Sequence, residues 1–297
     1  MRHLLGIEGL RRSDIEALLD RAEAHLHGSP DASHVLRGKV VANLFFEDST
    51  RTRTSFEMAA HALGAEVLNW TMAGSSVSKG ETLLDTARNI EATGPVALII
   101  RHRSSGAPHL VARHVRCAVV NAGDGTHEHP SQALLDAFTL RRRWGKLDGR
   151  TVLIIGDILH SRVARSNLHC LTALGAKVVL CGPPTLLPPG LEALGARVTS
   201  RLDEVLPEAD AVMCLRVQSE RQSESFFPSA REFSRLFGLN AARAERLKPE
   251  ALVLHPGPMN RGVEIAPAVA DGPHSVILEQ VAHGVAVRRA VLEVVCR

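Results

Sequence analysis

Short apolar runs alternate with segments of helical periodicity along the chain, and this alternation restricts the fold more than any other feature of the sequence. The clearest strand-like runs cover residues 39–46, 65–70, 96–101, 118–121, 151–155, 177–180, 211–216 and 251–254. Between them lie segments whose apolar residues recur every three or four positions, as in a helix with one buried face. Repeated strand–helix units predict an α/β protein with open, doubly wound parallel sheets, which bind ligands at the carboxyl ends of their strands.

The length of 297 residues predicts two such domains. A glycine-rich polar turn at residues 144–149 precedes a new strand, so we predict a first domain over 1–143 and a second over 144–274. The remaining residues, 275–297, have helical periodicity and are expected to pack back on the first domain. Ser13 and Glu16 have the spacing of a capping box that starts the first helix, and residues 218–235 are polar enough to predict a long loop.

Composition indicates a globular protein without a membrane segment. The net charge of +3 is too small to argue for nucleic acid or membrane binding, and no run approaches the ~18 apolar residues of a membrane span. The five cysteines form no C-x-x-C pair, so we interpret them as buried free thiols in a reducing compartment. A cytoplasmic location is therefore expected.

Residues 45–57 predict a phosphate-binding strand–loop–helix. An apolar strand ends at Glu47, and hydroxyl and guanidinium groups crowd the start of the following helix, whose free N–H groups attract anions. Arg51 and Thr52, at the helix opening, are the predicted ligands. Arg53 lies two positions further, about 200° around the helix, and is predicted to form an ion pair with Glu47 or Glu57.

A second cluster, at residues 127–132, places His129 just before a helix and Gln132 three residues later. A histidine and an amide can donate hydrogen bonds to a carbonyl and stabilise an oxyanion. One alternative is that His129 is a buried histidine whose hydrogen bonds are all made within the protein core. The other is a metal site formed by His127 and His129. An H-x-H pair with no clear third ligand is weak support for a metal, so we expect none.

The second domain carries arginines where strands end. Arg162 follows one predicted strand and Arg216 ends another. Together they suit a dicarboxylate, although either alone would be interpreted as part of a surface ion pair. The turn Gly156–Arg162 lacks the glycine spacing that cradles a dinucleotide. Gly257 and Pro258 form a rigid turn whose carbonyl groups can accept bonds from a ligand amide. Lys79 lies in a polar loop, where it is either solvated or able to close over an anion.

These motifs, in this order and over essentially the whole chain, resemble the aspartate/ornithine transcarbamoylase family, and within it the aspartate-specific branch. Ser49-Thr50-Arg51-Thr52-Arg53 resembles the family's carbamoyl-phosphate signature. The resemblance implies a carbamoyl-phosphate-binding domain over 1–143, an aspartate-binding domain over 144–274 and an active site between them.

The resemblance also implies a role for each matching residue. Ser49, Thr50, Arg51 and Thr52 would hold the phosphate, and Arg101 and His129 would polarise the carbamoyl carbonyl. Gln132 and the backbone at Gly257 and Pro258 would hold the carbamoyl amide. The aspartate carboxylates would be held by Arg162, Arg216 and Gln218. Ser75 and Lys79 would reach a neighbouring subunit's active site in a homotrimer.

The activity implied is carbamoyl transfer to the α-amine of L-aspartate, an early step of pyrimidine biosynthesis, without metal or cofactor. The catalytic residues would be Arg51, Thr52, Arg101 and His129. Three cations (Lys79, Arg162 and Arg216) favour aspartate over ornithine, whose ammonium they would repel. Transfer to another amine such as ornithine, and a non-catalytic phosphate sensor, remain alternatives. Regulatory or dihydroorotase-type partner chains are possible.

Overall fold

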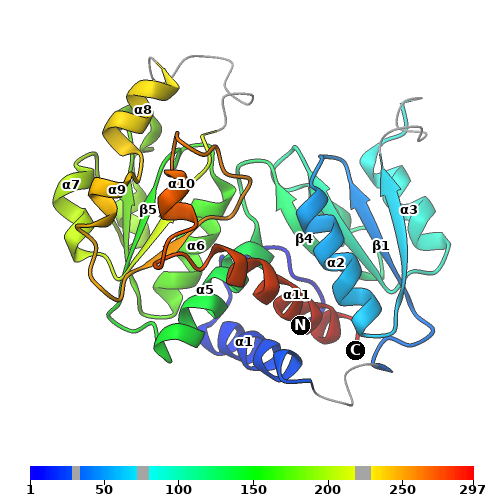
Figure 1. The fold of residues 1–297 in the computed structure, drawn as a ribbon. Coiled ribbons are helices and arrows are strands. Elements are labelled where there is room, and N and C mark those ends of the chain that lie inside the picture. Colours follow the sequence, from blue (N-terminus) through cyan, green and yellow to red (C-terminus); the bar gives the residue numbers. More distant parts are fainter. Residues whose placement is uncertain (29–33, 72–79, 218–228) are drawn as a thin grey trace. The chain divides into compact units, whose positions relative to one another are not determined.

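The computed structural model describes residues 1–28, 34–71, 80–217 and 229–297. The chain divides into two compact units. Unit 1 comprises Met1–Phe138 and Ala282–Arg297, and unit 2 comprises Thr139–Val281. Each unit contains one parallel β-sheet with flanking helices (Figure 1).

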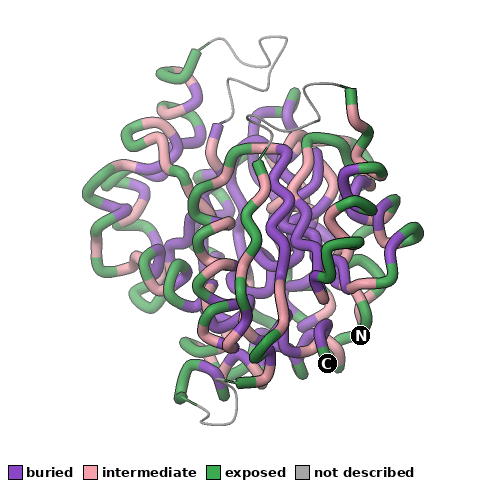
Figure 2. The backbone as a smooth tube through the Cα atoms, turned by 90° about the vertical axis from the view of Figure 1, so that its right-hand side faces the viewer, coloured by how far each residue is buried: buried purple, intermediate pink, exposed green. Residues whose placement is uncertain are grey.

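The sheet of unit 1 has the strand order β2-β1-β3-β4, and every neighbouring pair is parallel. Its strands are β1 (Val40–Phe45), β2 (Glu66–Thr71), β3 (Ala97–His102) and β4 (Ala118–Asp124). β1, β3 and β4 are buried along most of their length, as expected of parallel strands covered on both faces. Figure 2 shows such buried stretches of backbone beside exposed ones. β2 lies at the edge of the sheet and is largely exposed.

Four connecting helices and parts of two long ones belong to unit 1: α1 (Arg12–Leu26), α2 (Thr50–Ala62), α3 (Leu83–Ala92), α4 (Ala107–Ala112), α5 (Pro130–Trp144) and α11 (Ile277–Val295). α1 and α11 lie side by side (Figure 1). Between them the buried Glu293 carboxylate lies 2.7 Å from Arg21 Nη1 and 2.8 Å from His25 Nε2. The end of the chain thereby joins the unit that contains its beginning.

The sheet of unit 2 has the order β7-β6-β5-β8-β9 and is also entirely parallel. Its strands are β5 (Thr151–Ile155), β6 (Lys177–Cys181), β7 (Ala196–Thr199), β8 (Ala211–Cys214) and β9 (Leu252–Leu254). The helices are α6 (Arg162–Ala173), α7 (Leu202–Val205), α8 (Ala230–Phe237), α9 (Ala241–Ala244) and α10 (Pro267–Ala270), with 3-10 turns η3 (Pro184–Leu186), η4 (Leu191–Leu194) and η5 (Leu206–Glu208).

The predicted fold class of two parallel α/β sheets is confirmed, but two local predictions were wrong. The first helix begins at Arg12 rather than after Ser13, because Asp14 accepts a bond from Arg11 N and pairs with the Arg11 guanidinium. The predicted loop over 218–235 is wrong for its last residues, because α8 begins at Ala230, with Ser229 as a cap that accepts from Glu232 N. Residues 218–228 lie outside the described part.

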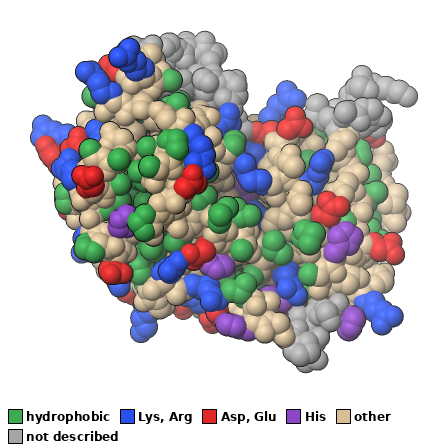
Figure 3. Space-filling view, viewed as in Figure 1, with side chains coloured by type: hydrophobic (Ala, Val, Ile, Leu, Met, Phe, Trp, Pro, Cys, Tyr) green, Lys and Arg blue, Asp and Glu red, His purple; other side chains and the backbone are tan. Residues whose placement is uncertain are grey.

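Figure 3 draws one face of the molecule, on which basic and acidic side chains are interspersed. Among the residues drawn there, that face has no broad basic patch of the kind that binds a nucleic acid backbone. No helix among the described residues is both long and apolar enough to cross a membrane.

Candidate functional site

In unit 1 the predicted ligand residues follow three neighbouring strands. Arg51 and Thr52 come after β1, Arg101 is the second-last residue of β3, and His129 follows β4. These strands are adjacent and parallel, with Phe45 paired to Arg101. The carboxyl ends of β1, β3 and β4 therefore meet at one edge, where the strand order reverses between β1 and β3. Such a reversal is the usual ligand position in doubly wound sheets.

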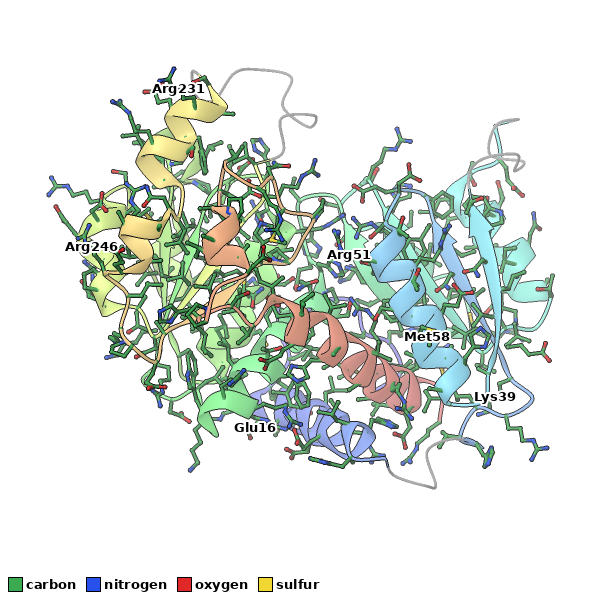
Figure 4. The ribbon with its side chains drawn as sticks, viewed as in Figure 1. Glu16, Lys39, Arg51, Met58, Arg231 and Arg246 are labelled. Carbon is green, nitrogen blue, oxygen red and sulfur yellow. The ribbon has the colours of Figure 1, made fainter. Side chains whose placement is uncertain are left out.

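The start of α2 presents the phosphate signature. Ser49 is the N-cap residue with extended backbone, and its hydroxyl makes no capping hydrogen bond. Thr52 is buried, while Arg51 is exposed at the opening of the helix (Figure 4). The first N–H groups of a helix and the positive end of its dipole favour an anion there. Arg51 and Thr52 thus lie in the first turn of α2, as the sequence indicated, and their role as phosphate ligands stays a prediction.

The predicted partner of Arg53 was wrong. Among the described residues Arg53 forms no ion pair with Glu47 or Glu57. Glu47 Oε2 instead lies 3.4 Å from Arg101 Nε, and Glu57 accepts a bond from an asparagine side chain. The reason is local: Phe46 N donates to Arg101 O at 2.8 Å, which brings the residue after Phe46 beside the end of β3.

Arg101 is held from two sides at the end of β3. Its Nη1 donates to Ala122 O at 3.2 Å, and Glu47 lies against its Nε. The guanidinium is about one-tenth exposed. Glu47 was not predicted as part of this site, because its sequence position gives no sign of which strand end it faces.

His129 and Gln132 lie at the start of α5. Both side chains are buried, at 5% and 8% exposure, and Gln132 N donates to His129 O at 3.0 Å. Gln132 Nε2 also donates to Asp136 Oδ1 at 3.0 Å, one helical turn further on. Asp136 is fully buried and was missed by the sequence analysis. The sequence did contain a sign of this hydrogen bond, because an amide and a carboxylate four positions apart lie on the same face of a helix.

The alternative of an H-x-H metal site at His127 and His129 gains no support among the described residues, because the groups with metal-compatible spacing contain His127 but not His129. The Glu128 carboxylate accepts bonds from Ile7 N at 2.9 and 2.8 Å and from Glu8 N at 2.9 Å. It therefore fastens the N-terminal segment to the loop after β4.

A different group in unit 1 has metal-compatible spacing. One ligand atom each from His109, Asp124 and His127 lies within 4.8 Å of the others. The Asp124 carboxylate, however, accepts bonds from Gly106 N at 2.6 Å and Glu128 N at 3.1 Å, and His127 Nδ1 lies 3.1 Å from its Oδ2. Hydrogen bonding accounts for this arrangement without an ion, and we assign no metal to it.

In unit 2 the predicted ligand residues again follow neighbouring strands. Arg162 is the first residue of α6, after β5, and Arg216 follows β8. β5 and β8 are adjacent and parallel, and the strand order reverses between them. Arg162 is only 5% exposed, and Ser161 caps its helix by accepting from Ala164 N at 3.1 Å. Both arginines thus lie at the reversal of the second sheet.

The turn after β9 is fixed by hydrogen bonds around His255. Gly257 N donates to His255 Nδ1 at 2.8 Å, so the ring proton is on Nε2, which donates to the buried Glu264 at 3.1 Å. The Gly257–Pro258 peptide bond is cis. Asn260 Nδ2 donates to Val217 O at 3.0 Å, which ties this turn to the segment that carries Arg216.

Three predicted residues, Ser75, Lys79 and Gln218, lie outside the described residues. A cavity of about 560 Å³ in unit 2 is lined by apolar residues such as Leu202 and Phe233 and by charged residues such as Asp203, Glu232 and Arg243. None of the predicted ligand residues lines it, so it is not the candidate site.

Comparison with known proteins extends over both units. A family model described as the carbamoyl-P binding domain of aspartate/ornithine carbamoyltransferase matches residues 2–142, and one described as the Asp/Orn binding domain matches 148–295. The aspartate carbamoyltransferase catalytic subunit of Myxococcus xanthus is 80% identical over 294 residues, covering 99% of each chain.

Two solved structures have closely similar folds. Aspartate transcarbamoylase from Trypanosoma cruzi in complex with N-(phosphonacetyl)-L-aspartic acid has a TM-score of 0.90 and 31% identity, covering 98% of this chain and 95% of that one. Ornithine carbamoyltransferase from Thermus thermophilus has a TM-score of 0.88 and 30% identity, covering 100% and 99%.

The two sheets define an α/β protein of two units, each with polar residues where its strand order reverses. The chain belongs to the aspartate/ornithine carbamoyltransferase family, because the two family models together match nearly its whole length. The family resemblance seen in the sequence motifs is confirmed.

Proposed function

We propose that this chain transfers the carbamoyl group of carbamoyl phosphate to the α-amine of L-aspartate, giving N-carbamoyl-L-aspartate and phosphate. The observation that carries the proposal is the gathering of Arg51, Thr52, Arg101 and His129 at the adjacent ends of β1, β3 and β4. This set combines donors for a phosphate with donors for a carbonyl oxygen, which is the chemistry of an acyl phosphate.

In this assignment residues 1–143 form the domain that binds the donor substrate. Ser49, Thr50, Arg51 and Thr52 hold the phosphate at the start of α2, where N–H groups and the helix dipole favour an anion. Arg101 and His129 donate to the carbamoyl oxygen. Gln132 binds the carbamoyl amide, as do the backbone carbonyl groups at Gly257 and Pro258.

The reaction needs no nucleophilic side chain. The aspartate amine attacks the carbamoyl carbon, a C–N bond forms, and the carbonyl oxygen becomes an oxyanion stabilised by Thr52, Arg101 and His129. The oxyanion then re-forms the C=O bond while the bond between the carbamoyl carbon and the bridging oxygen of the phosphate breaks. The leaving phosphate takes the proton lost by the amine. Positioning and preorganised charge supply the rate in this scheme.

Residues 144–274 form the domain that supplies the acceptor site. Arg162 and Arg216 bind the two carboxylates of aspartate, helped by Gln218 and by Lys79. The support is their position after β5 and β8, where the order of the second sheet reverses. Guanidinium groups bind carboxylates in a planar, two-bonded geometry, which suits a dicarboxylic acid.

Aspartate is favoured over ornithine as the acceptor. The similar TM-scores of the T. cruzi aspartate and T. thermophilus ornithine enzymes mean that the fold does not distinguish the two acceptors. The identity of 80% to an aspartate carbamoyltransferase catalytic subunit does favour aspartate. A positively charged acceptor site would also repel the second ammonium of ornithine.

We further propose a cytoplasmic homotrimer in which Ser75 and Lys79 reach the active site of a neighbouring subunit. Regulatory or dihydroorotase-type chains are its candidate partners. The product would enter pyrimidine biosynthesis. The mass of the assembly in light scattering tests the trimer, and a monomeric active enzyme would contradict it.

Phosphate release from carbamoyl phosphate tests the proposed reaction, with aspartate or ornithine as the acceptor. We expect release with aspartate and inhibition by N-(phosphonacetyl)-L-aspartate, which joins a phosphonate to a dicarboxylate. Release with ornithine alone would overturn the choice of acceptor. Release with neither acceptor, together with tight phosphate binding, would indicate a sensor instead.

A further inference from the structure

The Gln132 amide has a defined orientation because of Asp136. The 3.0 Å bond joins Gln132 Nε2 to Asp136 Oδ1, and both residues lie on the same face of α5, one turn apart. An ionised carboxylate only accepts hydrogen bonds, so the NH2 half of the amide must face it. The carbonyl oxygen of Gln132 then lies on the other side of the amide and is an acceptor only.

A buried arginine of α11 supplies positive charge near Asp136. Arg288 is 4% exposed, its Nη1 donates to Ser55 Oγ of α2 at 3.0 Å, and its guanidinium lies 5.1 Å from the centre of the Phe56 ring. Burial lowers the pKa of Arg288 to about 10, and the negative charge of Asp136 opposes that lowering. The guanidinium is therefore still charged at neutral pH.

The backbone of α11 is shaped to admit this arginine. A Cβ at Gly284 would lie 2.5 Å from Arg288 Nη1 and 3.3 Å from Leu135 Cδ2. A glycine there leaves room for the guanidinium, which contacts Ser55 and Phe56 of α2, while the same stretch of α11 lies close to Leu135 of α5. α11 thus lies against both the helix of the phosphate signature and the helix that carries Gln132.

We propose that Asp136 is a positioning residue that makes Gln132 select a carbamoyl donor over other acyl phosphates. This inference rests on the proposed function, in which Gln132 binds the carbamoyl amide. With its NH2 held by Asp136, Gln132 offers its carbonyl oxygen to the NH2 group of carbamoyl phosphate. Arg288 acts behind this pair as the counter-charge of the carboxylate.

Acetyl phosphate is the matched probe, because it replaces the carbamoyl NH2 by a methyl group of similar size. The methyl group has no proton to donate, so the Gln132 carbonyl loses its bond while the phosphate contacts remain. A polar group left unpaired on binding costs roughly one to two factors of ten in affinity. The wild-type protein should therefore bind acetyl phosphate about 10- to 100-fold more weakly than carbamoyl phosphate.

Asp136→Asn tests the proposal because it keeps the shape but lets position 136 donate as well as accept. The Gln132 amide can then flip and present its NH2 group to the NH2 group of the donor. We expect the KM for carbamoyl phosphate to rise roughly 10-fold or more, while the inhibition constants of acetyl phosphate and inorganic phosphate change by less than about threefold.

The selective change distinguishes positioning from a general structural role. If all three ligands weaken in proportion, or if discrimination against acetyl phosphate persists in Asp136→Asn, the proposal is wrong. The same holds if the wild-type protein does not discriminate. A wild-type protein without aspartate-dependent phosphate release would instead contradict the proposed function itself.

Two further variants keep the test decisive. Asp136→Asn leaves the Arg288 charge buried without its counter-charge and can destabilise the fold, so Asp136→Asn/Arg288→Met removes both charges. This double variant should fold and show the same loss of discrimination between carbamoyl phosphate and acetyl phosphate.

Gln132→Ala should lose this discrimination as well. Adding Asp136→Asn to Gln132→Ala should cause no further loss, because both residues act through one contact. Further loss of discrimination in that combination would overturn the proposal.

Discussion

Arg51 and Arg53 show how much a single position decides at the start of α2. Both are arginines of the same signature, but side chains two positions apart on a helix diverge by about 200°. Arg51 lies at the helix opening, where N–H groups and the dipole favour an anion. The predicted ion pair of Arg53 was wrong, and Glu47 instead forms an ion pair with Arg101.

Arg51→Ala should lower turnover by two or more orders of magnitude, because it removes a charged contact to the leaving phosphate. Arg51 is exposed, so the melting temperature should change little. Steady-state phosphate release and a thermal melt measure the two effects. Arg53→Ala, two positions away, is the control and should lose far less activity. Near-normal turnover in Arg51→Ala would refute its proposed role.

The residues predicted from sequence are those marked by a strand end followed by a polar helix start, such as Arg162 and His129. The residues that were missed act behind them. Glu47, Asp136 and Arg288 hold predicted ligand residues or their helices, but their partners come from other elements or from across a helical turn. Motif spacing does not reveal such contacts, since it carries no information about which elements pack together.

At the scale of elements, apolar runs were a good guide to buried strands and a poorer guide to edges and helix starts. β5 was predicted with its observed bounds, whereas the short edge strand β7 was not among the runs identified. β7 has only four residues, and of these only Ala196 is buried, so it offers no apolar run to identify. The predicted start of α1 was wrong because the capping interaction at the start of this helix joins Arg11 and Asp14 and does not involve Ser13.

The ends of β5 and β8 approach each other at Gly156. A Cβ there would lie 2.9 Å from Leu215 Cβ and 3.0 Å from Leu215 O, and the φ of 138° is unfavourable for any other residue. Gly156→Ala should cost about 2–4 kcal/mol of unfolding free energy. It should also raise the KM for aspartate more than that for carbamoyl phosphate, because Arg162 and Arg216 follow these two strands.

Gly149→Ala separates the two causes. Gly149 has a φ of 73° in the same unit, but a Cβ there would meet nothing within 4 Å. It should cost only the backbone penalty, about 1–2 kcal/mol, and leave both KM values unchanged. Chemical denaturation measures the costs. Equal losses in the two variants would show that the close approach of β5 and β8 contributes nothing.

At the scale of the whole molecule, buried thiols set the response to alkaline pH. Burial raises the pKa of Cys181 to about 12 and that of Cys296 to about 11, and it also raises that of Cys214. Thiols of the unfolded chain ionise near pH 9. Above that pH the folded state holds more protons than the unfolded state, so stability falls as pH rises.

The unfolding free energy should therefore be insensitive to these thiols below about pH 9. Between pH 9 and 11 it should fall by up to about 1.4 kcal/mol per pH unit for each thiol. The chain contains no tyrosine, which removes another group that titrates in this range. Urea denaturation at several pH values measures this dependence. In Cys181→Ala, the fall of the unfolding free energy with pH should be smaller by the contribution of one thiol. An unchanged slope would contradict the burial argument.

The most direct test of the central claim is the identity of the product. Carbamoyl phosphate labelled with carbon-13 at the carbonyl group is incubated with the purified chain and equal concentrations of aspartate and ornithine, and followed by NMR. We predict that the label appears in N-carbamoyl-L-aspartate with one phosphate released per product. Label in the carbamoylated ornithine, or only in products of spontaneous breakdown, would contradict the assignment.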